Sequence, residues 1–378
     1  MSIQARQYTS KKTGKTTTKY YAVVFDAKQN KAIWSKQSYK TEREAKREEA
    51  RMLHDLEEDI RISGKMIFKE VVKSWTESSA DTYANSTFQG YLWYLGHYLL
   101  PVFEDKYIDE IEPKHLQIFV NELSKQYSPE TVNKNINILS NIFQHAVTLK
   151  LVKSNLMEGI KRKKVVVEKK ETWTTDQIQE FLSFDVVKAS PYYEMFLLSF
   201  LTGMRPSEVC GISSGDLNDR GLLVLNRGYD RYGVLSDMKT TRSHRPIQLS
   251  KNITAILKNR IARQKKQADL LGDEYAQNDF LFKQDNGLPI TPNVYSKAFK
   301  RCLRVYNKQA ETKLPDICLY SAARHSFGTN LIVDDNMPTS VVASLMGNSE
   351  RVLTQRYVHV SNSVQSVAIN AYADKILA

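Results

Sequence analysis

The stretch around which this chain is organised lies near its end and reads LYSAARHSFGTNLIVDDNMPTSVVASLMGNSERVLTQRYVHV from Leu319 to Val360. It places an arginine, Arg324, and a tyrosine, Tyr357, at a fixed separation. The planar guanidinium of an arginine can hold two oxygens of a phosphate at once. The phenol of a tyrosine can attack phosphorus and form a covalent phosphotyrosine. Because the chain has 20 tyrosines and most tyrosines only pack, the interpretation depends on the residues that accompany this one.

The composition favours a multidomain globular protein with a polyanionic partner. A length of 378 residues predicts two or three domains, and 42% apolar with 25% charged residues is typical of water-soluble proteins. The formal net charge of +12 indicates nucleic acid as the best-fitting partner. The three cysteines, Cys210, Cys302 and Cys318, lack metal-ligand spacing. We therefore expect reduced thiols and no zinc site.

No membrane or secretory segment is visible in the sequence. No stretch approaches the roughly 18 consecutive apolar residues of a transmembrane helix, and residues 1–12 contain no apolar signal region. We expect a cytoplasmic protein that has no membrane partner.

Residues 1–62 are predicted to form a small three-stranded sheet backed by one helix. Alternating patterns in Lys19–Phe25 and Ala32–Tyr39 indicate strands joined by a turn. Thr41 and Glu44 stand at the spacing of a capping box, which predicts a helix from this point. The element order is that of a compact β-sheet module with a single covering helix.

This first unit is strongly basic. Residues 1–40 contain nine Lys or Arg and one acid, Asp26. Strands with basic and aromatic residues on their outer face can enter a DNA groove, so Lys19 and Lys36 are candidate DNA contacts. A solubilising β module without DNA contact is the alternative.

Residues 66–164 read as a bundle of about four helices. In the last of these helices Ser128 is the expected N-cap and Pro129 the first helical residue. Its polar residues include Lys134 and the asparagines at 133, 135, 137 and 141, which can contact DNA or simply face solvent. A charged interdomain linker follows, and its basic residues are candidates for tracking the DNA backbone. They are Lys161, Arg162, Lys163 and Lys164.

Residues 172–378 are predicted to form a mixed, mostly helical unit. Thr174 and Gln177 have capping-box spacing, and a β-hairpin is expected from Leu222–Arg227 and Arg245–Ser250. The patterns after Lys251 are mainly helical. The predicted fold class is therefore mainly α and multidomain, with a small sheet at the N-terminus and a small β-hairpin sheet in the last domain.

Two further segments complete a candidate phosphate site. LTGMRPSEVCGI places Arg205 near a helix start and Glu208 three residues later, on the same face of that helix. MKTTRSHRPIQL places Lys239 on the expected hairpin, followed by Ser243 and Arg245. Taken singly, Arg205 is better explained by a structural ion pair with Glu208, and Lys239 by a solvated surface charge.

Taken together, these segments resemble the tyrosine recombinases, the integrases of phages and conjugative transposons, over nearly the whole chain. The matching segments are Thr202–Glu208, Lys239–Arg245, Arg324–Phe327 and Met346–Ser349, the last of them shortly before Tyr357. The resemblance implies an arm-type DNA-binding domain at 1–62, a core-binding helical domain at 66–164 and a catalytic domain at 172–378.

The resemblance also implies a reaction. Arg205 and Arg324 would clamp the scissile phosphate, Lys239 would protonate the leaving 5′ oxygen, and Tyr357 would attack. Such an enzyme cleaves and rejoins DNA through a 3′-phosphotyrosine to integrate or excise a mobile element, and needs no cofactor and no metal. It acts as a homotetramer on double-stranded DNA at core and arm-type sites. Accessory directionality or DNA-bending proteins are further expected partners.

Two positions depart from the family pattern. Ser321 and Asn348 stand where most members carry histidine, or tryptophan at the second position. Both side chains can still hydrogen-bond a phosphate oxygen and are kept as catalytic candidates, but neither can act as a general base near neutral pH. The proton acceptor for Tyr357 is therefore left open between His325 and His359. A DNA-binding relative with impaired catalysis and a relaxing enzyme of the type IB topoisomerase class are the alternatives.

Overall fold

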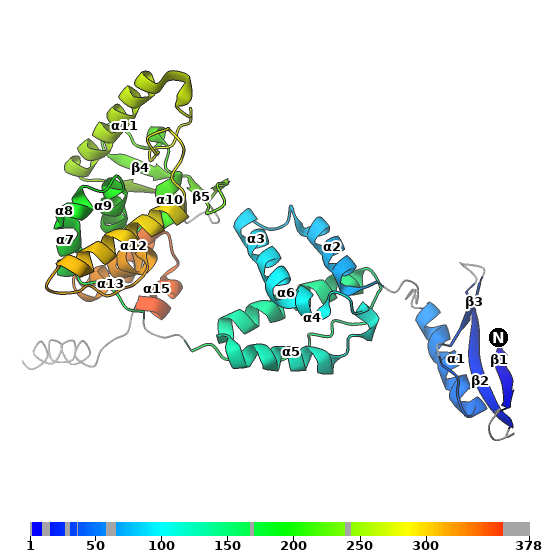
Figure 1. The fold of residues 1–378 in the computed structure, drawn as a ribbon. Helices are drawn as coiled ribbons and strands as arrows, with labels where there is room; N and C mark the ends of the chain where they lie inside the picture. Colours follow the sequence, from blue (N-terminus) through cyan, green and yellow to red (C-terminus); the bar gives the residue numbers. More distant parts are fainter. Residues whose placement is uncertain are drawn as a thin grey trace, which may run out of the picture. The chain divides into compact units, whose positions relative to one another are not determined.

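The structure is a computed structural model that describes residues 2–9, 16–26, 31–35, 37–57, 66–166, 170–238 and 243–357. The chain divides into two compact units, Met1–Val166 and Val167–Ala378 (Figure 1). Both are dominated by helices, and their small sheets are antiparallel, which confirms the predicted fold class. Within the described ranges no helix is long and apolar enough to cross a membrane.

The first unit begins with the predicted three-stranded sheet. Its strands are β1 (Ser2–Thr9), β2 (Thr16–Asp26) and β3 (Lys31–Trp34), paired antiparallel in the order β1-β2-β3. Because side chains alternate along a strand, Ala22 and Val24 of β2 share one face and are buried with Met52 of α1 (Glu42–Glu57). A sheet with one covered face leaves its other face available for contacts.

Helix α1 begins where the sequence predicts. Glu44 N–H donates to the Thr41 hydroxyl at 3.3 Å, and the Glu44 carboxylate accepts from Thr41 N–H at 3.2 Å. This reciprocal pair is the capping box expected from the spacing of the two residues.

The helical bundle of the first unit is built on a continuous apolar core. Its elements are α2 (Phe68–Ser79), α3 (Asn85–Tyr94), the π-helical turn η1 (Leu95–Leu99), α4 (Leu100–Phe103), the 3₁₀ turn η2 (Ile108–Glu110), α5 (Pro113–Gln126) and α6 (Pro129–Thr148). As predicted, Ser128 caps α6 and Pro129 opens it. Helix α6 buries more of its circumference than one apolar stripe, since Asn135 is also fully enclosed. Asn135 donates to Thr131 O at 3.0 Å, so it cannot be the DNA contact that its place among polar residues allowed.

The second unit consists of helices around two short β-ladders. Its elements are α7 (Thr175–Ser183), α8 (Asp185–Lys188), α9 (Tyr193–Thr202), α10 (Pro206–Gly211), η3 (Ser214–Asp216), β4 (Leu222–Leu225), β5 (Arg227–Tyr229), β6 (Leu235–Asp237), β7 (Arg245–Gln248), α11 (Lys251–Leu271), η5 (Gly272–Glu274), α12 (Pro292–Gln309), η6 (Tyr320–His325), α13 (Ser326–Val333), α14 (Thr339–Met346) and α15 (Glu350–Tyr357). Strand β4 pairs with β7, and β5 pairs with β6. Strands β4 and β7 therefore form the predicted hairpin, and the segment that connects them in the sequence contains the separate β5–β6 ladder.

An aromatic core holds this unit together. Trp173 is fully buried and stacks on Phe200 of α9, with ring centroids 5.8 Å apart. Its backbone N–H donates to the Ser326 hydroxyl at 2.8 Å, which ties the start of the unit to α13. The Thr174–Gln177 capping box then starts α7, as its spacing predicts.

Candidate active site

Arg205 stands at the N-terminus of α10, directly after a sharp turn. Helix α9 ends at Gly203, whose φ of 62° lies in the left-handed region, and Pro206 then occupies the first turn of α10. The Arg205 backbone N–H donates to Glu208 Oε2 at 2.9 Å, and its Nη1 donates to Glu208 Oε1. Glu208 therefore fixes both the backbone and the side chain of Arg205.

Gly203 is required by space as well as by φ. A Cβ at this position would clash with Cδ1 of Phe327 on α13. The close approach brings Gly203 O within 2.8 Å of Nη1 of Arg324. The glycine in this segment thus serves to pack the turn against the helix that follows Arg324.

Arg324 lies in η6, a π-helical segment, and is fully buried. Its Nη2 donates to Met346 O at 2.7 Å and to Asn348 Oδ1 at 3.0 Å. Nε has no hydrogen-bond partner among the described residues. Burial, together with the positive charge of Arg205, lowers the pKa of Arg324 to about 10, which still leaves the guanidinium charged at neutral pH.

Glu208 is the negative side chain among three arginines, Arg205, Arg245 and Arg324, which together with it form the arginine cluster. Its Oε2 lies 3.0 Å from Nη2 of Arg245, and both side chains are nearly fully enclosed. Burial alone would raise the pKa of Glu208, but the charge and hydrogen bond of Arg245, with the charges of Arg205 and Arg324, outweigh it and lower the pKa. The carboxylate stays ionised and offsets part of the positive charge around it.

Arg245 is a member of the site that the sequence pattern did not single out as functional. Its Nε donates to Leu345 O at 2.6 Å, next to the Met346 O that Arg324 holds. Two guanidiniums therefore bind the last carbonyls of α14, which carry the negative end of the helix dipole. The signal in the sequence was the alternation of β7, which puts Arg245 on the same buried side as Ile247.

Asn348 follows the end of α14 and bridges the two predicted phosphate ligands. Its Oδ1 accepts from Nη2 of Arg205 at 2.9 Å and from Nη2 of Arg324 at 3.0 Å. Gly347, with a φ of 64°, ends the helix and turns the chain toward these arginines. The structure thus brings Arg205, Glu208, Arg324 and Asn348 together, although they come from three separate segments of the chain.

Ser321 and His325 lie on η6 beside Arg324 but face other partners. The Ser321 hydroxyl accepts from Cys318 Sγ at 3.5 Å and bonds to neither arginine in the described part of the chain. His325 is buried with its ring edge-on to Tyr320, at 4.8 Å between centroids. Enclosure against an aromatic ring is typical of a packed histidine, and its role as a base stays a prediction.

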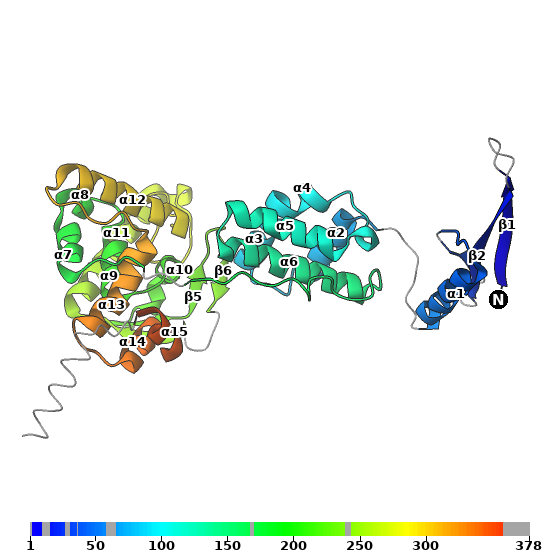
Figure 2. The same cartoon turned by 90° about the horizontal axis from the view of Figure 1, so that it is seen from below.

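Tyr357 is the last residue of α15, which packs on α13 and α14 (Figure 2). The helix that carries the expected nucleophile thus packs on the helix that follows Arg324 and on the helix that precedes Asn348. The side chain of Tyr357, and the whole of Lys239 and His359, lie outside the described residues. In the sequence Lys239 comes two residues after the end of β6 at Asp237, and its place on the hairpin stays a prediction.

The basic linker is held against the helical bundle. Asn133 Nδ2 donates to Lys163 O, and Lys163 N–H donates to Asn133 Oδ1, both at 2.8 Å. Lys134 Nζ lies 4.4 Å from the ring centroid of Tyr91 in a cation–π contact. The side chains of Lys161, Arg162 and Lys164 are exposed, whereas Lys163 is half-buried.

The uncovered face of the N-terminal sheet carries cations and aromatic rings. Arg6 stacks over Trp34 at 4.8 Å, and Lys19 lies over Tyr8 at 5.5 Å. Phe25 on the same face is 57% exposed, which is high for an aromatic side chain. Lys36, the other predicted contact of this unit, lies outside the described residues.

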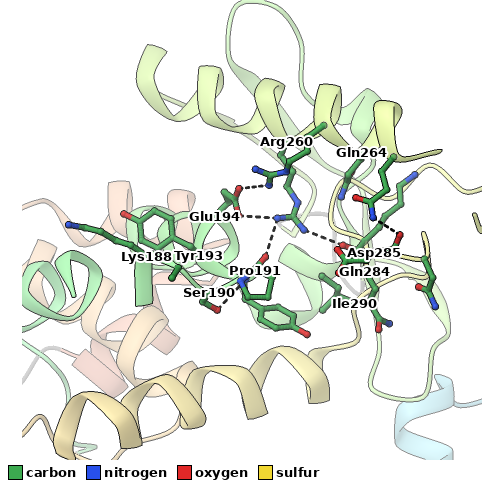
Figure 3. Close-up of a pocket in the computed structure, with 16 residues that line it drawn as sticks. Lys188, Ser190, Pro191, Tyr193, Glu194, Arg260, Gln264, Gln284, Asp285 and Ile290 are labelled. Atoms are coloured by element: carbon green, nitrogen blue, oxygen red, sulfur yellow. Dashed lines mark hydrogen bonds and ion pairs between the residues drawn. The ribbon is translucent and has the colours of Figure 1, made fainter. Parts of the chain in front are cut away.

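A polar cavity of about 670 Å³ lies elsewhere in the second unit. Arg260 of α11 donates to Glu194 Oε2 at 2.9 Å, to Pro191 O at 3.2 Å and to Lys283 O at 3.2 Å (Figure 3). Burial would raise the pKa of Glu194, but the hydrogen bond from Arg263 and the charge of Arg260 lower it. None of the predicted site residues lines this cavity, and its charges tie α11 to the start of α9.

Comparison with known proteins agrees with the geometry. Residues 171–363 match the phage integrase family, and residues 68–163 match the phage integrase central domain. The chain is 26% identical over 262 residues to the transposase from transposon Tn916 of Enterococcus faecalis, covering 66% of this chain and 63% of that protein. It is 22% identical over 283 residues to the ICEBs1 integrase of Bacillus subtilis, covering 73% of this chain and 76% of that protein.

Solved structures show the same fold. The Tn1549 transposon integrase in complex with transposon right end DNA superposes with a TM-score of 0.65 at 19% identity, over 82% of this chain and 100% of that one. A lambda integrase tetramer bound to a Holliday junction gives a TM-score of 0.55 at 14% identity, over 91% of this chain and 95% of that one. With the family match spanning residues 171–363, the arginine cluster and the helix that bears Tyr357 fall inside the matched region, and this chain belongs to the phage integrase family.

Proposed function

We propose that this chain is a site-specific DNA recombinase that integrates and excises a mobile element. In the proposed reaction, DNA is cleaved and rejoined through a covalent 3′-phosphotyrosine at Tyr357. The observation that carries the proposal is the pair of guanidiniums, Arg205 and Arg324, which share one acceptor atom of Asn348 at 2.9 and 3.0 Å. The proposed place of action is the bacterial cytoplasm, on the host chromosome.

The arginine pair suits a phosphodiester transition state. Negative charge grows on the non-bridging oxygens during attack, and fixed guanidiniums stabilise that charge without reorganising at the moment of reaction. Glu208 binds Arg205 and is itself paired with Arg245, whereas Arg324 is held by Gly203 O and Met346 O. Arg205, whose side chain is 31% exposed, is the member that an incoming phosphate meets first.

In the proposed reaction, cleavage and rejoining each break one bond to phosphorus and form another. The phenolate oxygen of Tyr357 attacks phosphorus, the bond from phosphorus to the 5′ oxygen breaks, and Lys239 supplies the proton that the 5′ oxygen takes up. The proton of the phenol leaves to a base that is not assigned. A 5′ hydroxyl from another strand reverses the attack and releases Tyr357, so the energy of the phosphodiester bond is kept.

The basic surfaces suit the delivery of DNA. The two hydrogen bonds between Asn133 and Lys163 hold the basic linker against α6. The proposed contacts to phosphates along a core site are the exposed linker residues Lys161, Arg162 and Lys164, together with Lys134. The cationic and aromatic face of the N-terminal sheet would contact a separate arm-type site. In this proposal residues 1–62, 66–164 and 172–378 act as arm-binding, core-binding and catalytic domains.

The proposed assembly is a homotetramer on two double-stranded DNA sites, with accessory directionality or DNA-bending proteins as further partners. The support comes from the family and from the lambda integrase structure, which is a tetramer on a Holliday junction. The chain spans 63% of the length of the Tn916 transposase that it matches, so each partner is part of the proposal.

A nicked suicide substrate tests the proposal. The intact chain should form a covalent protein–DNA adduct when the released strand diffuses away, and Tyr357→Phe should form none. No adduct from the intact chain would support the DNA-binding relative instead. Relaxation of supercoiled DNA without strand exchange between two sites would support the topoisomerase alternative.

The arm-binding role needs a separate experiment. Deletion of residues 1–60 should abolish binding to one class of DNA site and leave binding to the core site intact. Unchanged binding to every site would show that the N-terminal sheet has no such role.

A further inference from the structure

Asn348 joins the two arginines through a single atom. Its Oδ1 accepts from Nη2 of Arg205 at 2.9 Å and from Nη2 of Arg324 at 3.0 Å. Arginine has hydrogen-bond donors only, so the amide oxygen and not the amide nitrogen must face both guanidiniums. One oxygen that accepts from two guanidiniums is also the arrangement that a phosphate oxygen would adopt between them.

Each terminal nitrogen of Arg324 already has a protein acceptor. Nη1 bonds to Gly203 O, and Nη2 is shared between Met346 O and Asn348 Oδ1. The Arg324 side chain is 0% exposed, whereas that of Arg205 is 31% exposed. A phosphate that approaches over Arg205 therefore reaches Nη2 of Arg324 at the position that Asn348 Oδ1 occupies, because the remaining donor without a partner among the described residues, Nε, is fully enclosed.

The exchange of one oxygen for the other favours the phosphate. The amide is neutral, whereas a phosphodiester carries a full negative charge and forms stronger hydrogen bonds with guanidinium groups. Arg205 and Arg324 also repel each other, and an anion between them relieves this repulsion more than an amide dipole does. The amide is thus strong enough to organise the pair and weak enough to be replaced.

The Asn348 side chain can leave without a change of the backbone. Gly347 adopts a φ of 64° and ends α14, and the Asn348 backbone N–H donates to Ala343 O at 3.0 Å. The backbone is therefore anchored, while the side chain is only half-buried. Rotation about the side-chain bonds moves Oδ1 away from the two guanidiniums.

We propose that Asn348 is a displaceable internal ligand of the arginine pair. Its amide oxygen holds Arg205 and Arg324 in position while the site is empty, and the scissile phosphate replaces that oxygen when DNA binds. This inference deepens the proposed function and rests on its phosphodiester substrate.

Inorganic phosphate tests the exchange without DNA. The melting temperature of the full chain is measured with rising phosphate at constant ionic strength, for the natural chain and for Asn348→Ala. Without phosphate the variant should melt at a lower temperature, because the arginines lose their shared acceptor. It should bind phosphate roughly tenfold tighter, because phosphate no longer competes with the charge-assisted hydrogen bond to the amide oxygen. Its melting temperature should therefore rise more than that of the natural chain when phosphate is added.

Asn348→Asp is the opposite variant. A carboxylate at this position is a permanent anion between the arginines, so the melting temperature should rise without phosphate and respond little when phosphate is added. If Asn348→Ala folds poorly, Asn348→Ser serves in its place, because its side chain is too short to bridge both guanidiniums. A phosphate response of the shortened variant that equals or falls below that of the natural chain overturns the proposal.

Arg205→Ala combined with Asn348→Ala is the matched control. The double variant should lose the extra phosphate response, and an extra response that persists places the phosphate elsewhere and also overturns the proposal. The outcome is independent of the recombinase assignment. A stronger response of Asn348→Ala in a protein that forms no DNA adduct would keep the internal ligand and reject the recombinase.

Discussion

Glu208 and Arg245 form a buried ion pair at the centre of the arginine cluster, with 3.0 Å between Oε2 and Nη2. Glu208 also accepts from the backbone of Arg205, and Arg245 also donates to Leu345 O. The pair therefore connects the turn that carries Arg205 to the end of the helix that precedes Asn348. Its stability bears on the whole site, although neither residue needs to touch DNA.

Glu208→Gln should lower the free energy of unfolding by about 3 to 5 kcal/mol, because Arg245 is left as a buried charge without a counter-ion. Chemical denaturation of the full chain measures the change. Asp219→Asn is the control, since Asp219 forms its ion pair with Lys258 at the surface and its loss should not change stability measurably. Equal effects of the two substitutions would contradict the structural role given to Glu208.

The same carboxylate predicts a dependence on pH. The cationic neighbours of Glu208 hold its pKa in the folded chain below the unfolded value of about 4.3. Its contribution to stability is therefore complete above the unfolded pKa and is lost as the pH falls through the lower, folded pKa. Denaturation midpoints measured from pH 6 downward should fall in acid, and less steeply for Glu208→Gln. Parallel curves for the two proteins would contradict this assignment.

Gly203→Ala should destabilise the chain by about 1 to 3 kcal/mol, the cost of a left-handed conformation in a residue other than glycine. The added Cβ would also clash with the Phe327 ring and displace the carbonyl that Arg324 binds. Gly90→Ala is the control, because Gly90 lies within α3 with open space where the added methyl would lie, and alanine favours helix. A neutral Gly203→Ala substitution would show that the turn is looser than the structure indicates.

Asn133→Ala should release the basic linker from α6. The two hydrogen bonds to Lys163 are lost together, which should raise the rate of tryptic cleavage at Lys161–Lys164 roughly tenfold. DNA binding should weaken, since the linker cations are no longer held beside Lys134. Asn121→Ala on α5 is the matched control, and equal cleavage rates for both variants would show that Asn133 does not clamp the linker.

The sequence predicted those features that depend on neighbours along the chain. The capping boxes of Thr41 and Thr174 need only residues three positions apart, and both are present. Glu208 likewise binds Arg205 as the helical spacing requires. Local geometry is set by local sequence, so these expectations carried over to the structure.

The contacts that local spacing could not predict join distant segments. Arg245 reaches Leu345 across 100 positions, and Arg205 reaches Asn348 across 143. No periodicity or spacing encodes such contacts, because they arise only when separate elements of the fold pack together. Asn135 shows the same limit, since this residue of a polar run is enclosed by the bundle, where its amide nitrogen donates to Thr131 O of its own helix.

The position of the covalent bond to DNA decides whether Tyr357 is the nucleophile. The intact chain is incubated with a nicked suicide substrate, the adduct is digested, and the modified peptide is sequenced by mass spectrometry. We expect a nucleotide linked through its 3′ phosphate to Tyr357, and no adduct from Tyr357→Phe. An adduct on another residue, or one that survives Tyr357→Phe, would contradict the proposed reaction.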